Sequence, residues 1–154
     1  MMNPSQNHVM KLLLVDDDPS MIRLLSAIIE QSWRDEIEVV SRTDPQAARE
    51  WMDDHLIDIL ITDLEMPGIN GLQLLRWAKK RNPCAQVLFI TGHSTLDAIV
   101  DAMELGATDY LLKPLDRDEF VELIAHLQKR FHRWRRALAG TFVAEQERRT
   151  TCDV

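Results

Sequence analysis

The chain has 154 residues, of which 45% are hydrophobic and 28% charged, a composition typical of one globular domain. It has no apolar run near the eighteen or so residues of a membrane span, and its start, "MMNPSQNHVMK", lacks the apolar core of a signal peptide. Its two cysteines, Cys84 and Cys152, show neither metal-binding nor disulfide spacing. We therefore expect a cytoplasmic protein without a disulfide framework.

Charge is distributed unevenly along the chain. Residues 1–128 hold 11 Lys and Arg against 22 Asp and Glu, whereas residues 129–154 hold 7 against 3. The acidic main part is a poor candidate for binding nucleic acid, because that binding depends on cations that neutralise phosphates. We expect one domain over residues 9–128 and a basic helical extension over residues 129–154.

Short apolar runs alternate with longer amphipathic stretches. The runs predict five strands, over residues 11–15, 37–42, 57–62, 86–91 and 109–113. The stretches predict five helices, over residues 20–33, 44–55, 72–80, 94–106 and 116–139. Asp44 before Pro45 indicates a capped helix start, and we expect Gly140 to end or weaken the last helix. This alternation predicts an α/β fold, a doubly wound parallel sheet with helices on both faces.

Polar residues follow four of the predicted strands at their carboxyl ends. Asp16 and Asp17 follow the first strand, Asp63 follows the third, and Thr91 and Lys113 end the fourth and fifth. In a parallel sheet these positions share one edge, where such folds form their sites. Carboxylates gathered at one edge need a cation, and oxygen ligands suit Mg²⁺. Asp63 is placed to be a metal ligand and a nucleophile that forms an acyl phosphate, whose oxygens Lys113 and Thr91 would bind.

Taken singly, each of these residues has a structural explanation. An aspartate after a strand often forms a turn or caps a helix, and we expect this role for Asp18, which precedes Pro19. A threonine at a strand end can reflect β-propensity alone, and Lys-Pro is common in surface turns. The chemical interpretation therefore depends on all of the residues meeting at the same edge.

Four stretches resemble the receiver domains of two-component response regulators, and the resemblance covers roughly residues 9–128. They are "LLLVDDDPSM", "DILITDLEMPGINGLQLL", "VLFITGH" and "GATDYLLKPLD", in the order and spacing of that family. The resemblance is greatest to receivers of the nitrogen-regulatory type. It implies a flavodoxin-like fold of five βα units and a role in phosphorelay signalling. Asp63 would receive a phosphoryl group from a sensor histidine kinase or a phosphotransfer protein, and the chain would catalyse only its own phosphorylation and dephosphorylation.

The resemblance also implies a set of metal ligands. Asp17 and Asp63 would ligate Mg²⁺, Asp16 would help through water, and the Glu65 backbone carbonyl would complete the site. It gives Asp18 no fixed role.

A further set of residues resembles the family's activation switch. Thr91 and Lys113 match its hydroxyl and lysine positions, and Tyr110 matches an aromatic residue that reorients on activation. The Lys113–Pro114 bond resembles one that is cis in the family. Activation would bias a surface formed by the helix over 94–106, the strand over 109–113 and the last helix.

The alternative is a phosphatase of the haloacid-dehalogenase type. Asp16 would then be the nucleophile and Asp18 the acid, with Thr91 and Lys113 as the later motifs. This alternative leaves Asp63 and the "MPGING" loop without a role. A nucleotide-binding module is weaker still, because no Gly-rich loop follows the first strand.

The last helix carries a stripe of apolar residues at alternating spacings of four and three. They are Phe120, Ile124, Leu127, Phe131, Trp134 and Leu138. This is the a/d pattern of a coiled coil. The first three suffice to pack the helix on the sheet, and the last three lie beyond that contact. We expect the outer part to pair with its twin in a homodimer, the alternatives being its own domain or an output partner. Nucleic acid is the least favoured partner, because the acidic body would oppose it.

Overall fold

The computed structural model describes residues 8–152, with side chains described for residues 8–149. The chain divides into two compact units, Met1–Arg117 and Asp118–Val154. None of the described helices is both long enough and apolar enough to cross a bilayer.

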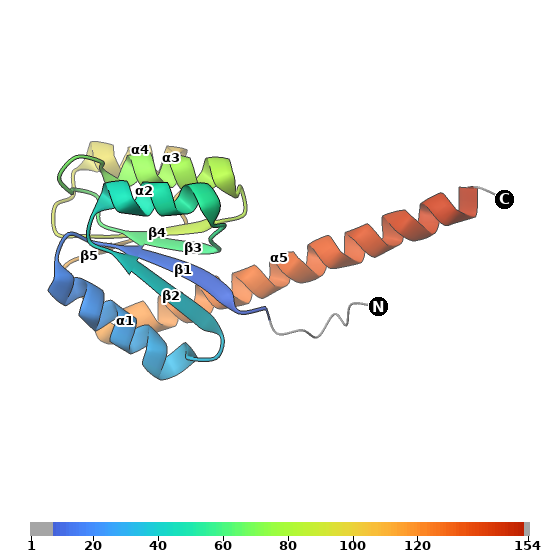
Figure 1. Cartoon of the computed structure of the whole chain (residues 1–154), viewed down its shortest axis with the longest axis horizontal. Helices are drawn as coiled ribbons and strands as arrows, with labels where there is room; N and C mark the ends of the chain where they lie inside the picture. The colour runs from blue at the N-terminus through green and yellow to red at the C-terminus, as the bar shows by residue number, and fades with distance from the viewer. Residues whose placement is uncertain (1–7, 153–154) are drawn as a thin grey trace. The chain divides into compact units, whose positions relative to one another are not determined.

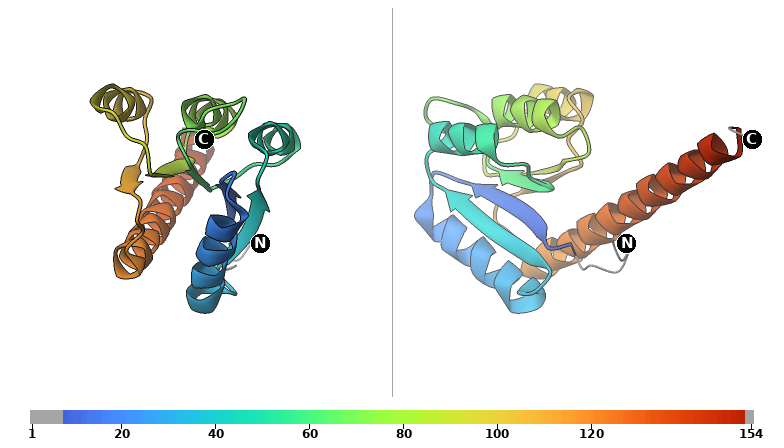
Figure 2. Two further views of the ribbon diagram at one scale, coloured as in Figure 1. Left: turned by 90° about the vertical axis from the view of Figure 1, so that its left-hand side faces the viewer. Right: turned by 45° about the vertical axis from the view of Figure 1, so that its right-hand side comes forward.

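The first unit is an α/β domain with a five-stranded parallel sheet. The strands are β1 (Met10–Val15), β2 (Ile37–Arg42), β3 (Ile59–Thr62), β4 (Gln86–Thr91) and β5 (Asp109–Leu112), in the order β2-β1-β3-β4-β5. The helices of this unit are α1 (Pro19–Trp33), α2 (Pro45–Asp54), α3 (Gly71–Arg81) and α4 (Leu96–Glu104). Helix α1 lies on one face of the sheet, and α2, α3 and α4 lie on the other (Figures 1 and 2). The prediction of a doubly wound parallel sheet is confirmed.

The central strands β3 and β4 are buried along their whole length. Helices cover both faces of the sheet, so these strands read as nearly continuous apolar runs rather than alternating ones. Parallel register pairs Val15 with Thr62 and Thr62 with Phe89, while Thr91 pairs with Leu112. The carboxyl ends of the four strands β1, β3, β4 and β5 therefore meet at one edge.

Side-chain caps set the starts of several helices. Asp18 accepts a hydrogen bond from the Ser20 amide at 2.9 Å and caps α1, which is the structural role expected of it. Asp44 caps α2 as predicted, with Pro45 in the first turn. Helix α4 begins at Leu96 because the Thr95 hydroxyl caps it.

Several boundaries differ from the prediction by one or two residues. Strand β3 begins at Ile59 instead of residue 57, because the Asp58 carboxylate accepts from the Lys11 amide in place of a backbone carbonyl. Strand β5 ends at Leu112, one residue early. Helix α4 ends at Glu104, ahead of Gly106, which has a φ of 89°.

The described residues of the second unit all lie in one long helix, α5 (Arg117–Cys152). Helix α5 continues through Gly140, so the expectation that the helix would end there is wrong, while the expectation that Gly140 weakens it stays a prediction. A glycine that ends a helix usually adopts a positive φ, and Gly140 does not. Glycine costs a helix about 1 kcal/mol relative to alanine, and the preceding residues Ala137, Leu138 and Ala139 are all strong helix formers, so the helix continues through Gly140.

Candidate functional site

The site lies at the carboxyl edge of the sheet, where backbone hydrogen bonds position its residues. The Asp63 amide donates to the Val15 carbonyl at 3.1 Å, which places Asp63 beside the residue that follows Val15, Asp16. The Lys113 amide donates to the Thr91 carbonyl at 2.8 Å, so the ends of β4 and β5 are held together in the same way. The predicted convergence of these residues therefore follows directly from strand pairing.

Three carboxylates gather at this edge. Asp16, Asp17 and Asp63 each offer one oxygen, and these oxygens all lie within 4.8 Å of one another. Asp16 and Asp63 are buried, with 2% and 8% of their surface exposed, whereas Asp17 is exposed. Burial of two like charges is costly unless a cation offsets them.

Lys113 supplies a cation to both buried carboxylates. Its Nζ lies 3.0 Å from Asp16 Oδ2 and 3.0 Å from Asp63 Oδ2. Burial alone would lower the pKa of Lys113, but the hydrogen bonds to Asp63 and Asp16 outweigh it and the pKa is raised. The lysine is therefore charged at neutral pH. Burial raises the pKa of Asp16, although the Asp18 amide and Lys113 act to lower it.

The second oxygen of each buried carboxylate accepts a backbone hydrogen bond. Asp16 Oδ1 accepts from the Asp18 amide at 2.9 Å, and Asp63 Oδ1 accepts from the Glu65 amide at 3.3 Å. The structure thus places Glu65 next to the cluster through its amide. The contribution of its carbonyl to metal binding stays a prediction.

Gly71, at the start of α3, has a structural role at the site that the residue pattern alone does not reveal. A Cβ at this position would lie 2.3 Å from the Asp63 carbonyl oxygen and 2.7 Å from the Phe89 ring. The Gly71 amide also donates to the Leu64 carbonyl at 2.8 Å. Glycine lets the loop after β3 turn close against Asp63, and the only signal in the sequence was its place between the "MPGIN" loop and an apolar helix.

Thr91 and Tyr110 are both tied to the loop between β4 and α4. The buried Thr91 hydroxyl donates to the His93 carbonyl at 3.1 Å and accepts from the His93 amide at 3.2 Å. The Tyr110 hydroxyl donates to Ser94 Oγ at 3.2 Å. The two predicted switch residues therefore contact consecutive residues of one loop, and Ser94 was not identified from the sequence.

Comparison with known proteins agrees with this geometry. The family model described as "Response regulator receiver domain" matches residues 12–125. The chain is a member of the response regulator receiver family. It is 33% identical over 115 residues to the response regulator protein PilR of Pseudomonas aeruginosa, which covers 75% of the chain. It is 51% identical over 67 residues, or 44% of the chain, to the DNA-binding transcriptional regulator NtrC of Klebsiella pneumoniae.

These relatives are much longer than the chain. The matched residues span 25% of PilR and 14% of NtrC. Solved receiver structures match the fold over most of their length. A CheY-like receiver from Methanospirillum hungatei gives a TM-score of 0.75 at 22% identity and covers 82% of this chain and 98% of its own. The beryllofluoride-activated NtrC4 receiver dimer gives 0.70 at 27% identity, covering 79% and 98%.

Membership of the receiver family leaves the phosphatase alternative without support. Its proposed acid, Asp18, is exposed and caps α1 instead of joining the carboxylate cluster. Asp63, which that alternative left without a role, lies at the centre of the site.

The donor set of the receiver domain fits a hard divalent cation. Three carboxylate oxygens within 4.8 Å of one another suit Mg²⁺, which is bound through a few carboxylates and keeps several waters. The three carboxylates and Lys113 together carry two excess negative charges, which a divalent cation would balance. Exposed Asp17 gives the cluster a side open to solvent.

Proposed function

We propose that this receiver domain works in a phosphorelay and accepts a phosphoryl group on Asp63 from the phosphohistidine of a sensor histidine kinase or a phosphotransfer protein. The observation that carries the proposal is the joint position of Asp63, Asp16 and Lys113, with one ammonium 3.0 Å from both buried carboxylates. Structural ion pairs alone do not explain a third, exposed carboxylate beside them. Its own phosphorylation and dephosphorylation are the only reactions that we propose for the chain.

In the transfer, a bond forms between a carboxylate oxygen of Asp63 and phosphorus as the bond between phosphorus and the histidine nitrogen breaks. Lys113 stays protonated because its pKa is raised. Its ammonium group can exchange the hydrogen bond to the Asp63 carboxylate for one to an oxygen of the incoming phosphoryl group. Asp17 and Asp63 would ligate Mg²⁺, with Asp16 acting through water and the Glu65 carbonyl completing the set. The bound metal would neutralise charge on the phosphoryl oxygens.

The response would begin at Thr91. To bind a phosphoryl oxygen, its hydroxyl must stop donating to the His93 carbonyl, which frees the loop before α4. Ser94 in that loop accepts from Tyr110, so movement of the loop also releases the tyrosine hydroxyl. The switch thus couples the site to Tyr110 through two hydrogen bonds.

The surface of α4 and β5 is the part of the domain that we expect to change its binding partners when the switch residues move. Four of its apolar side chains are exposed: Leu96 (76%), Val100 (42%), Met103 (70%) and Leu112 (58%). Large apolar side chains that are exposed together on neighbouring elements can mark interaction sites. We propose that this surface changes partners when Thr91 and Tyr110 move.

Other features of the proposal rest on the family rather than on geometry. These are the division into a receiver over 9–128 and an extension over 129–154, and a cytoplasmic location. NtrC is described as DNA-binding, but the acidic body of this chain gives no reason to propose nucleic acid as its own partner. The predicted homodimer through the last helix stays a prediction.

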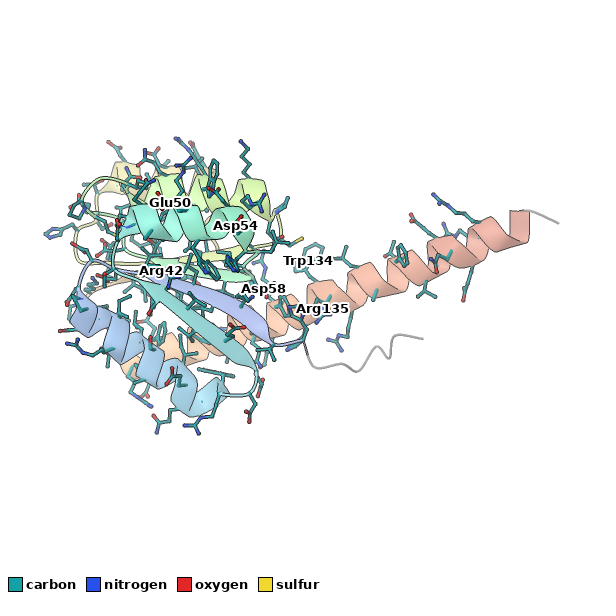
Figure 3. All side chains as sticks on the ribbon, in the orientation of Figure 1. Arg42, Glu50, Asp54, Asp58, Trp134 and Arg135 are labelled. Atoms are coloured by element: carbon teal, nitrogen blue, oxygen red, sulfur yellow. The ribbon has the colours of Figure 1, made fainter. Side chains whose placement is uncertain are left out.

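The test is labelling with acetyl phosphate and Mg²⁺, followed by intact mass measurement. The wild-type chain should gain one phosphoryl group, and Asp63→Asn should gain none. Asp54→Asn is the matched control, because Asp54 is an exposed carboxylate of α2 (Figure 3). Undiminished labelling of Asp63→Asn, or labelling that maps to Asp16, would overturn the assignment.

A further inference from the structure

A groove lies on the surface of the first unit between α2 and α3. These two helices lie side by side on one face of the sheet and pack against each other (Figures 1 and 2). The α2–α3 groove has a volume of about 430 Å³, which is within the range of small-molecule sites. Its lining combines three cations, Arg49, Arg76 and Lys80, with the side chains of Ile69 and Trp77. None of its lining residues is acidic.

The three cations of the groove have no carboxylate partner among the described side chains. No ion pair within residues 8–149 includes Arg49, Arg76 or Lys80. Arg76 and Lys80 lie four residues apart on α3, a spacing at which like charges destabilise a helix, and α3 contains no acidic residue to offset them. This local positive charge stands within residues 1–128, which hold 22 acidic residues against 11 basic ones. The groove is therefore a cationic site in an acidic domain.

Trp77 holds one of these cations in place. Its indole Nε1 donates to Asp53 Oδ1 of α2 at 3.0 Å, which fixes the ring between the two helices. The Cζ of Arg49 lies 4.4 Å from the centroid of this ring, and the Nζ of Lys80 lies 5.3 Å from it. Tryptophan is the aromatic residue that attracts cations most strongly in this geometry. A guanidinium that is already held loses less conformational entropy when it binds an anion.

The surface around the groove favours a small anion over a macromolecule. Helices α2 and α3, which the structure describes completely, expose no large apolar side chain, whereas protein interfaces have an apolar core and membrane-bound helices have an apolar face. Duplex nucleic acid would meet the acidic remainder of the domain. Arginine binds phosphate through paired hydrogen bonds, and two linked phosphoryl groups carry about three negative charges, which matches the three cations.

We propose that the α2–α3 groove binds the diphosphate group of a small ligand, either inorganic diphosphate or a nucleoside diphosphate. Arg49 of α2 and Arg76 of α3 bind its oxygens from the two walls, and Lys80 supplies the third positive charge. The bound anion also relieves the repulsion between Arg76 and Lys80. Binding makes and breaks no covalent bond, so the proposal is independent of phosphorylation at Asp63.

The experiment is titration calorimetry of the full chain with inorganic diphosphate, in EDTA so that no metal bridges the anion to the carboxylate site. Arg49→Gln with Arg76→Gln should weaken binding at least about tenfold, because each arginine contributes hydrogen bonds between charged groups. The matched control is Arg130→Gln with Arg133→Gln, which removes the same charge from the basic surface of α5. In salt of about 0.15 M this control should keep the affinity within about twofold, because distant charges are screened.

A second measurement locates the bound anion without any variant of the arginines. Diphosphate should shift the NMR signal of the Trp77 indole N–H, which Trp77→Phe identifies, and should leave the Trp134 indole unshifted. Comparison of ADP, inorganic diphosphate and adenosine then distinguishes the sources: tighter binding of ADP indicates a nucleotide, and equal affinities indicate the diphosphate group alone.

Four results would overturn the proposal. They are no binding of diphosphate or ADP at about 1 mM, adenosine binding as tightly as ADP, an unshifted Trp77 indole, and loss of affinity in the α5 control rather than in the groove variant. Tighter binding of a pentaglutamate peptide than of diphosphate, lost in Arg49→Gln with Arg76→Gln, would also overturn it and would favour an acidic protein partner.

Discussion

Replacing Lys113 with methionine should destabilise the metal-free domain through charge rather than through packing. Methionine keeps most of the length and apolar surface of the lysine stem. It removes the ammonium that lies 3.0 Å from both Asp16 and Asp63, and these carboxylates stay buried. The variant therefore holds two like charges at the sheet edge with no cation between them.

The expected loss is about 2–4 kcal/mol at pH 7. Two charges at 4.8 Å, the upper bound between the carboxylate oxygens, repel by about 3.5 kcal/mol at an effective dielectric near 20. Removing one partner from a fully buried ion pair costs about 3–5 kcal/mol, and the Lys113 side chain is 21% exposed, which reduces that figure. Protonation of Asp16 limits the loss. At its ordinary pKa of 3.8 this would cost about 4.4 kcal/mol at pH 7, and the raised pKa makes it cheaper.

Urea unfolding followed by circular dichroism in EDTA measures this loss. Lys80→Met is the matched control: its Nζ lies 5.3 Å from the Trp77 ring, and it should lose less than about 1 kcal/mol. The Lys113→Met deficit should shrink at pH 5, where Asp16 protonates more easily, and in 10 mM Mg²⁺. A deficit no larger than that of the control, or one unaffected by both pH and Mg²⁺, would refute the electrostatic explanation.

The site carboxylates, two glycines and the loop before α4 can each be tested separately. Burial raises the pKa of Asp16, so the stability that this carboxyl group contributes in EDTA is present below about pH 3.8 and is lost as pH rises through the raised pKa. Asp16→Asn should therefore gain stability relative to wild type as pH rises from 4 to 7. A difference in urea midpoint that stays constant over this range would contradict this. Asp17→Ala should weaken Mg²⁺ binding in calorimetry while leaving the metal-free protein as stable as wild type or more so, and unchanged affinity would argue against its role as ligand. Gly71→Ala should lower the free energy of unfolding by more than about 2 kcal/mol, because the added Cβ would meet the Asp63 carbonyl and the Phe89 ring. Gly140→Ala should raise helicity and increase the free energy of unfolding by about 0.5–1 kcal/mol, since nothing lies within 4 Å of the added Cβ. Equal effects of the two substitutions in thermal unfolding would count against the close approach at Gly71. Beryllofluoride with Mg²⁺ should shift the amide resonances of His93, Ser94 and Tyr110, and a silent loop would place the switch elsewhere.

The meeting of Asp16, Asp63, Thr91 and Lys113 could be predicted from the sequence because it depends on few assumptions. Alternating strands and helices imply parallel strands, and parallel strands end at a common edge. Any residue that directly follows a strand is then placed to within a few ångströms. The prediction needed no knowledge of side-chain rotamers.

The partners of individual side chains could not be predicted in this way. Nothing in the sequence indicates that the Lys113 ammonium contacts two carboxylates at once. Nor does it indicate that the Thr91 hydroxyl both donates to the His93 carbonyl and accepts from the His93 amide. The same holds for Asp58, whose carboxylate replaces a backbone acceptor and delays β3. The prediction of a helix end at Gly140 was wrong for a related reason. Whether a glycine ends a helix depends on its φ, and the residue type alone does not determine φ.

The remaining charge at the sheet edge connects stability with function. One lysine offsets only part of three carboxylates, so the folded domain keeps a local excess of negative charge that the unfolded chain disperses. Any cation that binds there stabilises the folded state by mass action, and removal of one carboxylate relieves the same excess. A cluster that served only stability would therefore gain from losing the exposed Asp17, which pairs with no cation among the described ion pairs. Its position beside two buried carboxylates agrees with the divalent cation and the phosphoryl group that the proposed function assigns to this edge.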